Sequence, residues 1–280
     1  MVNYTLFLVL IGTGLIGTVA GALGVFALLK GYSLLGDTIS HAALPGIALA
    51  FLYTQSKNPL ILLIGGALAS GIGTVLILII RRTTTLAHDA ILGIILSCFF
   101  GAGLMLLTHI QKCHPAHQSI ITKFLFGSAA TLLPTDIYCI AILATLCITV
   151  LILFWKEFTI LTFDPCLGYS CGYPMLMLEI LLTSLLVIAI MIGLQAVGAI
   201  LMSSLLIAPA AAARQWTTHL STMVMLSALI GAFSAIAGSI ISSHYEHIPT
   251  GPAITLVASA LVIISLIHAR RTPKKTLGSV

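Results

Sequence analysis

Two ionisable side chains lie four residues apart inside a long hydrophobic stretch of the chain. The stretch is GYSLLGDTISHAALPGIALAFLYT, residues 31–54, and the two residues are Asp37 and His41. In a helix this spacing places both side chains on one face, one turn apart. Carboxylate and imidazole are ordinary ligands of divalent transition metals, and ionisable residues within membrane segments commonly mark pathways. The pair therefore predicts an intramembrane metal site.

A structural role is the alternative for the same two residues. Asp37 could cap its helix, and His41 could bond to a neighbouring carbonyl. Pro45 follows His41 by four residues and denies the His41 carbonyl its helical hydrogen bond, which favours a bend. A carbonyl without its helical hydrogen bond is tolerated inside a membrane only where it contacts other protein groups or lines a water-filled cavity. Spacing alone leaves both interpretations open.

The composition places this pair in a membrane protein. Of the 280 residues, 59% are hydrophobic and 7% are charged, and the mean hydropathy is +1.18. A soluble protein could not bury so much apolar surface, and several apolar runs reach the roughly 20 residues that span a bilayer. We expect an all-α, multi-pass fold with a single transmembrane domain over residues 1–280. Its nine apolar segments are residues 4–29, 34–54, 59–80, 88–109, 135–154, 176–194, 196–213, 220–241 and 252–268.

Lys and Arg in the short loops predict how these segments are oriented. If all nine cross, one side holds nine basic residues: Lys30, Arg81, Arg82, Lys156, Arg214, Arg270, Arg271, Lys274 and Lys275. The other side holds three: Lys57, Lys112 and Lys123. The side rich in Lys and Arg is normally cytoplasmic. We therefore expect a protein of the cell (inner) membrane, with the N-terminus outside and a cytoplasmic basic tail at residues 270–280.

The segment at residues 196–213 is short and is interrupted by Gly198 and Pro209. It could be a pair of half-helices. With eight crossings in place of nine the division of charge would break, which favours nine. The first segment has a different feature, because Gly14, Gly17, Gly21 and Gly24 fall on one helix face. Small residues let helix backbones approach closely in lipid, so this face is expected to pack tightly against another helix.

Several functions are excluded or disfavoured by what the sequence lacks. There is no Walker A pattern, so the chain is not expected to hydrolyse ATP or to be an enzyme. No basic cluster is interleaved with aromatic residues, so nucleic acid is not an expected partner. The six cysteines show no zinc-finger or disulfide spacing, and nothing points to an organic cofactor.

Five stretches together resemble one known family. SLLGDTISHAALPGIALAFL is similar to the signature of the manganese/zinc/iron ABC-transporter permeases, the ABC-3 family. The others, in chain order, are LFGSAATLLPTD, FDPCLGYSCG, LQAVGAILMSSLLIAPAAAARQ and HIPTGPAITL, at residues 125–136, 163–172, 194–215 and 247–256. The FDP stretch departs from the family pattern, because Cys166 and Leu167 replace its usual Glu-Phe.

The resemblance implies roles for Asp37 and His41 and marks Asp89, and the sequence itself suggests further candidates. Asp37 and His41 would coordinate the metal in transit. Asp89 matches an acidic position of the family and is a further pathway candidate, although it could equally cap the helix that begins there. Gln195 could line the pathway or bond the broken backbone nearby. Six residues at the outer mouth could capture metal or be incidental: His109, Cys113, His114, His117, His244 and His247.

The resemblance also implies partners. The segment Pro209, Ala210, Ala211, Ala212, Ala213 and Arg214 lies where the family contacts its ATPase. The expected function is the permease subunit of an ATP-binding cassette importer for Mn, Zn or Fe, working by alternating access. A second copy of the chain, a cytoplasmic ABC ATPase dimer, an external metal-binding protein and membrane lipid would be its partners. The alternative is a proton-coupled secondary carrier or channel, which would use the same Asp and His and often has inverted repeats, but no repeat is visible.

Overall fold

The structure is a computed structural model that describes residues 2–55, 58–113, 127, 134–245 and 249–271. These residues form helices and connecting segments, with no strand among them. The helices are α1 (Val2–Leu29), α2 (Leu35–Thr54), α3 (Pro59–Thr83), α4 (His88–Cys113), α6 (Pro134–Leu153), α7 (Trp155–Phe163), α8 (Pro165–Ser170), α9 (Met175–Ala196), α10 (Ala199–Trp216), α11 (Leu220–His244) and α12 (Thr250–Arg271). The all-α, multi-pass fold expected from composition is confirmed.

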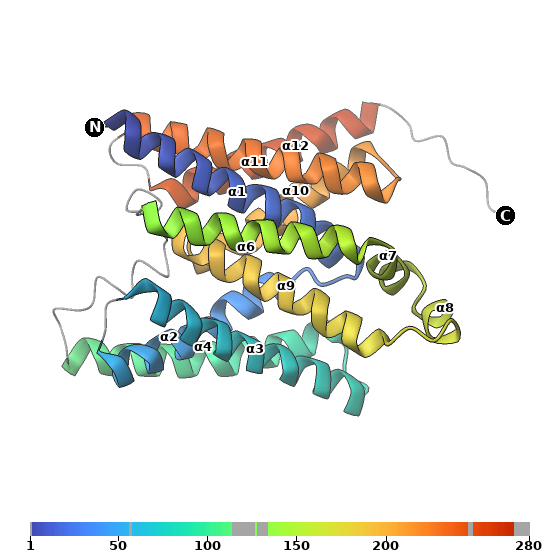
Figure 1. Ribbon diagram of the computed structural model, residues 1–280, viewed down its shortest axis with the longest axis horizontal. Helices are drawn as coiled ribbons and strands as arrows, with labels where there is room; N and C mark the ends of the chain where they lie inside the picture. Colours follow the sequence, from blue (N-terminus) through green and yellow to red (C-terminus); the bar gives the residue numbers. More distant parts are fainter. Residues whose placement is uncertain (1, 56–57, 114–126, 128–133, 246–248, 272–280) are drawn as a thin grey trace.

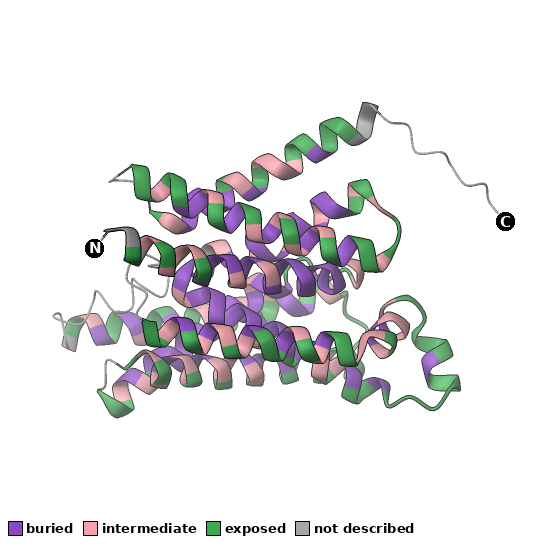
Figure 2. Cartoon of the chain, turned by 45° about the horizontal axis from the view of Figure 1, so that its top comes forward, coloured by how far each residue is buried: buried purple, intermediate pink, exposed green. Residues whose placement is uncertain are grey.

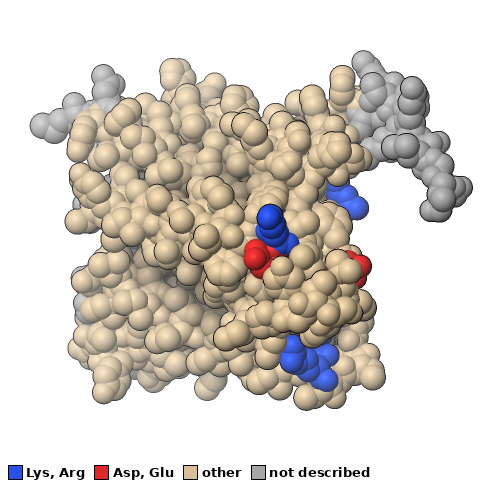
Figure 3. Space-filling view, turned by 45° about the vertical axis from the view of Figure 1, so that its right-hand side comes forward, with Lys and Arg blue, Asp and Glu red and all other residues tan. Residues whose placement is uncertain are grey.

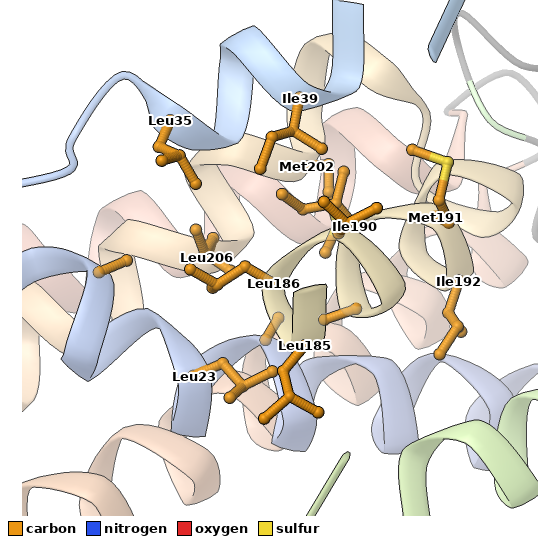
Figure 4. Close-up of a cluster of buried hydrophobic side chains, with 14 of the residues drawn as sticks. Leu23, Leu35, Ile39, Leu185, Leu186, Ile190, Met191, Ile192, Met202 and Leu206 are labelled. Atoms are coloured by element: carbon orange, nitrogen blue, oxygen red, sulfur yellow. The ribbon is translucent and has the colours of Figure 1, made fainter. Parts of the chain in front are cut away.

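The helices form two packed groups joined by a central helix. One group is α1, α10, α11 and α12, and the other is α2, α3 and α4 (Figure 1). Helix α9 lies between them and contacts α1, α2, α3, α6 and α10. Figure 4 shows side chains of α9 reaching both groups: Leu185 lies beside Leu23 of α1, Leu186 beside Leu206 of α10, and Ile190 near Ile39 of α2. Apolar side chains from both groups therefore share one core, and the exposed faces lie on the outer helices (Figure 2).

Among the described residues, eight helices are long and apolar enough to cross a membrane: α1, α2, α3, α4, α6, α9, α11 and α12. The ninth segment, α10, is not among them. It nevertheless finishes at the same end of the bundle as α1, α3 and α6, on the right in Figure 1. Arg214 belongs to its last turn, and Lys30, Arg81 and Lys156 lie at or just after the ends of those other helices. We call this end of the bundle the basic end. Figure 3 shows charged side chains near this end and none elsewhere on that face. The division of charge survives because α10, although it is not among the eight long apolar helices, also runs from the other end of the bundle to the basic end.

The helical structure near residues 196–213 is interrupted at Gly198 and not at Pro209. Helix α9 ends at Ala196, and Gly198 adopts a φ of 94° before α10 begins, a conformation that favours glycine. The expected pair of half-helices is wrong, because α10 continues through Pro209 to Trp216. Pro209 is buried within this helix, where packing outweighs the loss of one backbone hydrogen bond.

The glycine face of α1 packs against α11 and α10, as predicted. A Cβ on Gly17 would collide with the carbonyl oxygen of Gly231, and one on Gly21 with that of Ser227. A Cβ on Gly24 would meet the carbonyl oxygen of Leu206 on α10. The Ser227 hydroxyl donates to the Gly21 carbonyl at 2.7 Å, so the close approach also carries a hydrogen bond between helices.

Candidate metal site and the groove beside it

Asp37 occupies the first turn of α2, a helix that begins inside the bundle. After α1 the chain runs back from the basic end before α2 starts at Leu35, and Tyr32 within this linker is buried (Figure 1). The Asp37 carboxylate makes no hydrogen bond or ion pair with the described part of the chain. A negative charge in the first turn of a helix is favourable, but nothing shows Asp37 acting as a hydrogen-bonding cap.

Asp37 lines a groove of about 470 Å³ between α2, α10 and α12. The groove is lined by Ser33, Asp37, Ser203, Ser204, Ile207, Ala208, Ala211, Ser259, Val262 and Ile263. Gly36 makes the α2–α10 contact possible, because a Cβ there would lie 3.2 Å from the Cα of Ser203. The carboxylate therefore faces hydroxyl groups and small side chains from two other helices, and the groove is open at the surface of the chain.

His41 lies one turn further along the same face of α2. Its ring meets Phe100 of α4 edge-on, with the ring centroids 4.8 Å apart. Its Nδ1 is buried and has no hydrogen-bond partner within the described residues, and the same is true of Ser40 Oγ. A buried polar atom without a partner is costly. No described residue therefore bonds to this nitrogen of the imidazole. A histidine that serves as a metal ligand has such an unused nitrogen when the metal is absent.

These two residues do not make a complete coordination sphere by themselves. The described part of the chain contains no cluster of three or more His, Cys, Asp or Glu side chains able to hold a metal. Asp37 and His41 supply one oxygen-donor group and one nitrogen-donor group, a mixed set that suits Mn, Fe or Zn. Water, or groups from another chain, would have to supply the remaining ligands.

The two further pathway candidates lie away from this groove. Gln195 lines a separate apolar cavity of about 230 Å³ between α3, α6 and α9, together with Asp136. Asp89 is exposed in the first turn of α4 at the basic end. That position lets its charge interact favourably with the helix N-terminus. The structure therefore does not bring either residue together with Asp37 and His41.

The histidine-rich outer mouth is described only in part. His109 is exposed near the end of α4 and His244 is exposed at the end of α11. These helices lie on opposite sides of the bundle (Figure 1). His114, His117, His247 and the side chain of Cys113 lie outside the described residues. The two described histidines thus belong to different edges of the protein.

The segment expected to contact an ATPase is largely packed inside the chain. Ala210, Ala212 and Ala213 are buried, and the Ala212 carbonyl accepts a hydrogen bond from Ser265 of α12 at 2.9 Å. Pro209 is also buried, while Ala211 faces the Asp37 groove and Arg214 is exposed. This segment can therefore offer a partner only its exposed end, from Arg214 onward.

More apolar surface is exposed on the neighbouring helices α7 and α8. Phe163, Leu167 and Tyr169 are each more than half exposed at the basic end. Asp164 fixes the start of α8, because its carboxylate accepts from the Leu167 amide at 3.0 Å. The departure from the family pattern at Cys166 and Leu167 therefore falls on an exposed helix that keeps its cap.

Sequence reasoning missed a cluster of charges at the basic end. One oxygen of Glu179 on α9 accepts from Tyr32 at 2.8 Å and from Arg81 of α3 at 2.6 Å, and Lys30 lies 3.5 Å away. Tyr32 also packs on the ring of His88, with centroids 4.6 Å apart. The signal in the sequence was the single acidic residue within the apolar run of α9.

Burial controls the ionisation of the two cluster members that lie outside the spans. It lowers the pKa of Lys30, although the Glu179 carboxylate opposes this. Burial and the Glu179 charge both raise the pKa of Tyr32, so its hydroxyl stays protonated and continues to donate. The cluster joins the start of α2 to α3, α4 and α9, and thereby fixes the linker that positions Asp37.

Long apolar helices around an unpaired carboxylate and imidazole define a multi-pass membrane protein with a candidate ion path. The sequence model of the ABC 3 transport family matches residues 3–269. The chain belongs to that family, and the resemblance inferred from its motifs is confirmed.

Individual relatives support this assignment. The chain is 44% identical over 264 residues to the zinc transport system membrane protein TroC of Treponema pallidum, covering 94% of this chain and 89% of that protein. It is also 44% identical over 271 residues to the manganese transport system membrane protein MntC of Bacillus subtilis, covering 97% of this chain but 62% of that longer protein. Among solved structures, PsaBC from Streptococcus pneumoniae in complex with Fab superimposes with a TM-score of 0.80 at 31% identity, covering 92% of this chain and 89% of that one.

Proposed function

We propose that this chain is the permease subunit of an ATP-binding cassette importer for a divalent transition metal, Mn, Zn or Fe. The observation that carries the proposal is the placement of Asp37 and His41. They lie one turn apart within the bundle, neither forms a hydrogen bond with the described chain, and Asp37 borders a groove lined with hydroxyls. An ion passing this point would exchange part of its hydration shell for these two side chains.

Two copies of the chain would form the pathway. The groove beside Asp37 opens on the surface of a single copy, and a carboxylate facing lipid tails is costly. A second copy covering the groove would remove that cost and could supply the missing ligands. This argument supports a homodimer in which α2, α10 and α12 of both copies surround the ion, with lipid on the outer faces.

Energy would come from a separate ATPase dimer at the basic end, which the orientation rule makes cytoplasmic. The exposed Arg214 and the apolar side chains of α7 and α8 are the surfaces available there. Closure and reopening of the ATPases would open the Asp37 site alternately to the two sides of the membrane. An external binding protein would deliver the metal, and exposed His109 and His244 are the described candidates for its capture. Transport requires release as well as binding, so two protein ligands suit a transient site.

Reconstitution of the chain with its ATPase in proteoliposomes tests this function. ATP-dependent uptake of Mn²⁺, Zn²⁺ and Fe²⁺ should be measured ion by ion. Asp37→Ala and His41→Ala should each abolish uptake without loss of assembly, because each removes one of the two ligands. His219→Ala, which alters an exposed histidine away from the groove, is the control. Uptake that needs a proton gradient and no ATPase would instead identify the secondary carrier.

A further inference from the structure

The hydroxyl groups that line the Asp37 groove differ from most others in the bundle. Ser203 and Ser204 of α10 and Ser259 of α12 make no hydrogen bond with the described part of the chain. By contrast, Ser97, Ser184 and many threonines of the spans donate to the carbonyl three or four residues earlier. Such back-bonding is the ordinary way in which a helix satisfies a hydroxyl in lipid. The groove serines are therefore free to bond to something that occupies the groove.

Their positions form a path that starts at Asp37. The close contact of Gly36 with Ser203 places the first hydroxyl beside the turn that carries Asp37. Ser204, Ala208 and Ala211 follow at helical spacing on one face of α10, and all three line the groove. Because α10 runs from Ser203 toward Trp216 at the basic end, this face leads away from Asp37 in that direction. The two alanines keep the groove open where a larger side chain would fill it.

We propose that Ser203, Ser204 and Ser259 form a weak transit site for a partly hydrated divalent cation between Asp37 and the basic end. This proposal rests on the proposed function and adds residues and a selectivity to it. The polar groups that line the groove are a carboxylate and hydroxyls, with no thiol, thioether or imidazole among its described lining residues. Oxygen ligands bind Mn²⁺ in preference to softer metals such as Zn²⁺. A cation that keeps part of its hydration shell can replace single water molecules by serine hydroxyls as it moves.

A competing explanation is that these serines are merely small residues that allow close packing. The two explanations separate on replacement by alanine, which is smaller still and removes only the hydroxyl. Packing should survive in Ser203→Ala, Ser204→Ala and Ser259→Ala, and detergent stability should stay at the wild-type level. A transit role predicts that uptake falls although the protein remains folded.

The experiment is uptake of radioactive Mn²⁺ by the reconstituted permease–ATPase complex. The triple variant Ser203→Ala, Ser204→Ala, Ser259→Ala should lower the maximal rate about fivefold or more, the ratio expected from losing at least one net hydrogen bond at the barrier. The half-saturating concentration should not change, since Asp37 and His41 still bind the ion. Ser97→Ala and Ser184→Ala, which lose hydroxyls bonded to their own helix, should transport at the wild-type rate.

A second variant adds a gain-of-function test. Ser204→Cys would place a soft thiolate in the path, so Cd²⁺ should block Mn²⁺ uptake at concentrations that leave the wild-type protein active. A triple alanine variant that transports Mn²⁺ at the wild-type rate would overturn the transit site while leaving the Asp37 site standing. Absence of ATP-driven uptake by the wild-type complex would refute the proposed function, and the transit site with it.

Discussion

At the residue scale, the most informative side chains are charged or polar groups without an obvious partner. Asp37 and His41 were predictable, because ionisable residues stand out in an apolar run and helical spacing relates them directly. Ser203, Ser204 and Ser259 were not, since a serine hardly alters an apolar profile and its hydrogen bond is visible only in three dimensions. The Tyr32–Glu179 contact joins residues 147 positions apart, which no local pattern reveals.

The Glu179 cluster gives a prediction about stability. Glu179→Gln keeps the shape of the side chain but leaves Lys30 and Arg81 without their shared anion. We expect the free energy of unfolding to fall by about 2 kcal/mol. This is less than for a fully buried ion pair, because Arg81 is half-exposed to solvent. Thermal unfolding of the purified protein in detergent should show a lower melting temperature. Glu157→Gln, at an acidic residue with no ion pair in the described chain, is the control.

Tyr32→Phe refines the same measurement. It removes the hydroxyl that donates to Glu179 but keeps the ring that packs on His88. The loss of unfolding free energy should be smaller than for Glu179→Gln, about 1.5 kcal/mol, the lower end of the net value of a hydrogen bond to a charged group. A larger effect for Tyr32→Phe than for Glu179→Gln would show that the tyrosine, and not the carboxylate, holds the cluster together.

At the element scale, hydrophobic runs predicted the long helices closely. Residues 34–54 and 59–80 became Leu35–Thr54 and Pro59–Thr83, because each run ends at polar or turn-forming residues. The short helices α7 and α8 were missed, since they lie outside the apolar runs. Gly198 was correctly identified as a break, whereas Pro209 was not one, because tertiary packing around α10 holds the helix together through the proline.

The α1–α11 contact yields a prediction on packing. Leucine at Gly17 or Gly21 would meet backbone carbonyls of α11, which cannot turn aside as a side chain can. We expect each change to lower the free energy of unfolding by about 3 kcal/mol or more, so that little stable protein is recovered. Gly71→Leu on α3, where a Cβ meets nothing within 4 Å, should be tolerated. Equal yields and melting temperatures for Gly21→Leu and Gly71→Leu would show that the glycine face does not hold these helices together.

At the scale of the whole molecule, charge and topology agree on one basic end. Helices α1, α3, α10 and α12 finish there, while α4, α9 and α11 begin there (Figure 1). The exposed thiols of Cys166 and Cys171 lie at this end, beside α8. The orientation proposed for the chain places these two thiols in the cytoplasm, on the side where the ATPase must dock.

Thiol labelling tests that orientation directly. In a variant that keeps only Cys166 and Cys171, with the other cysteines replaced by alanine, a membrane-impermeant maleimide should label inverted vesicles and leave intact cells unlabelled. A second variant, in which His109→Cys near the opposite end of α4 supplies the single thiol, should show the reverse pattern. Labelling of Cys166 and Cys171 from outside the cell would show that the protein has the opposite orientation in the membrane. The groove that leads from Asp37 to the basic end would then be the entrance for the metal, and the ATPase would have to bind at the end where His109 and His244 lie.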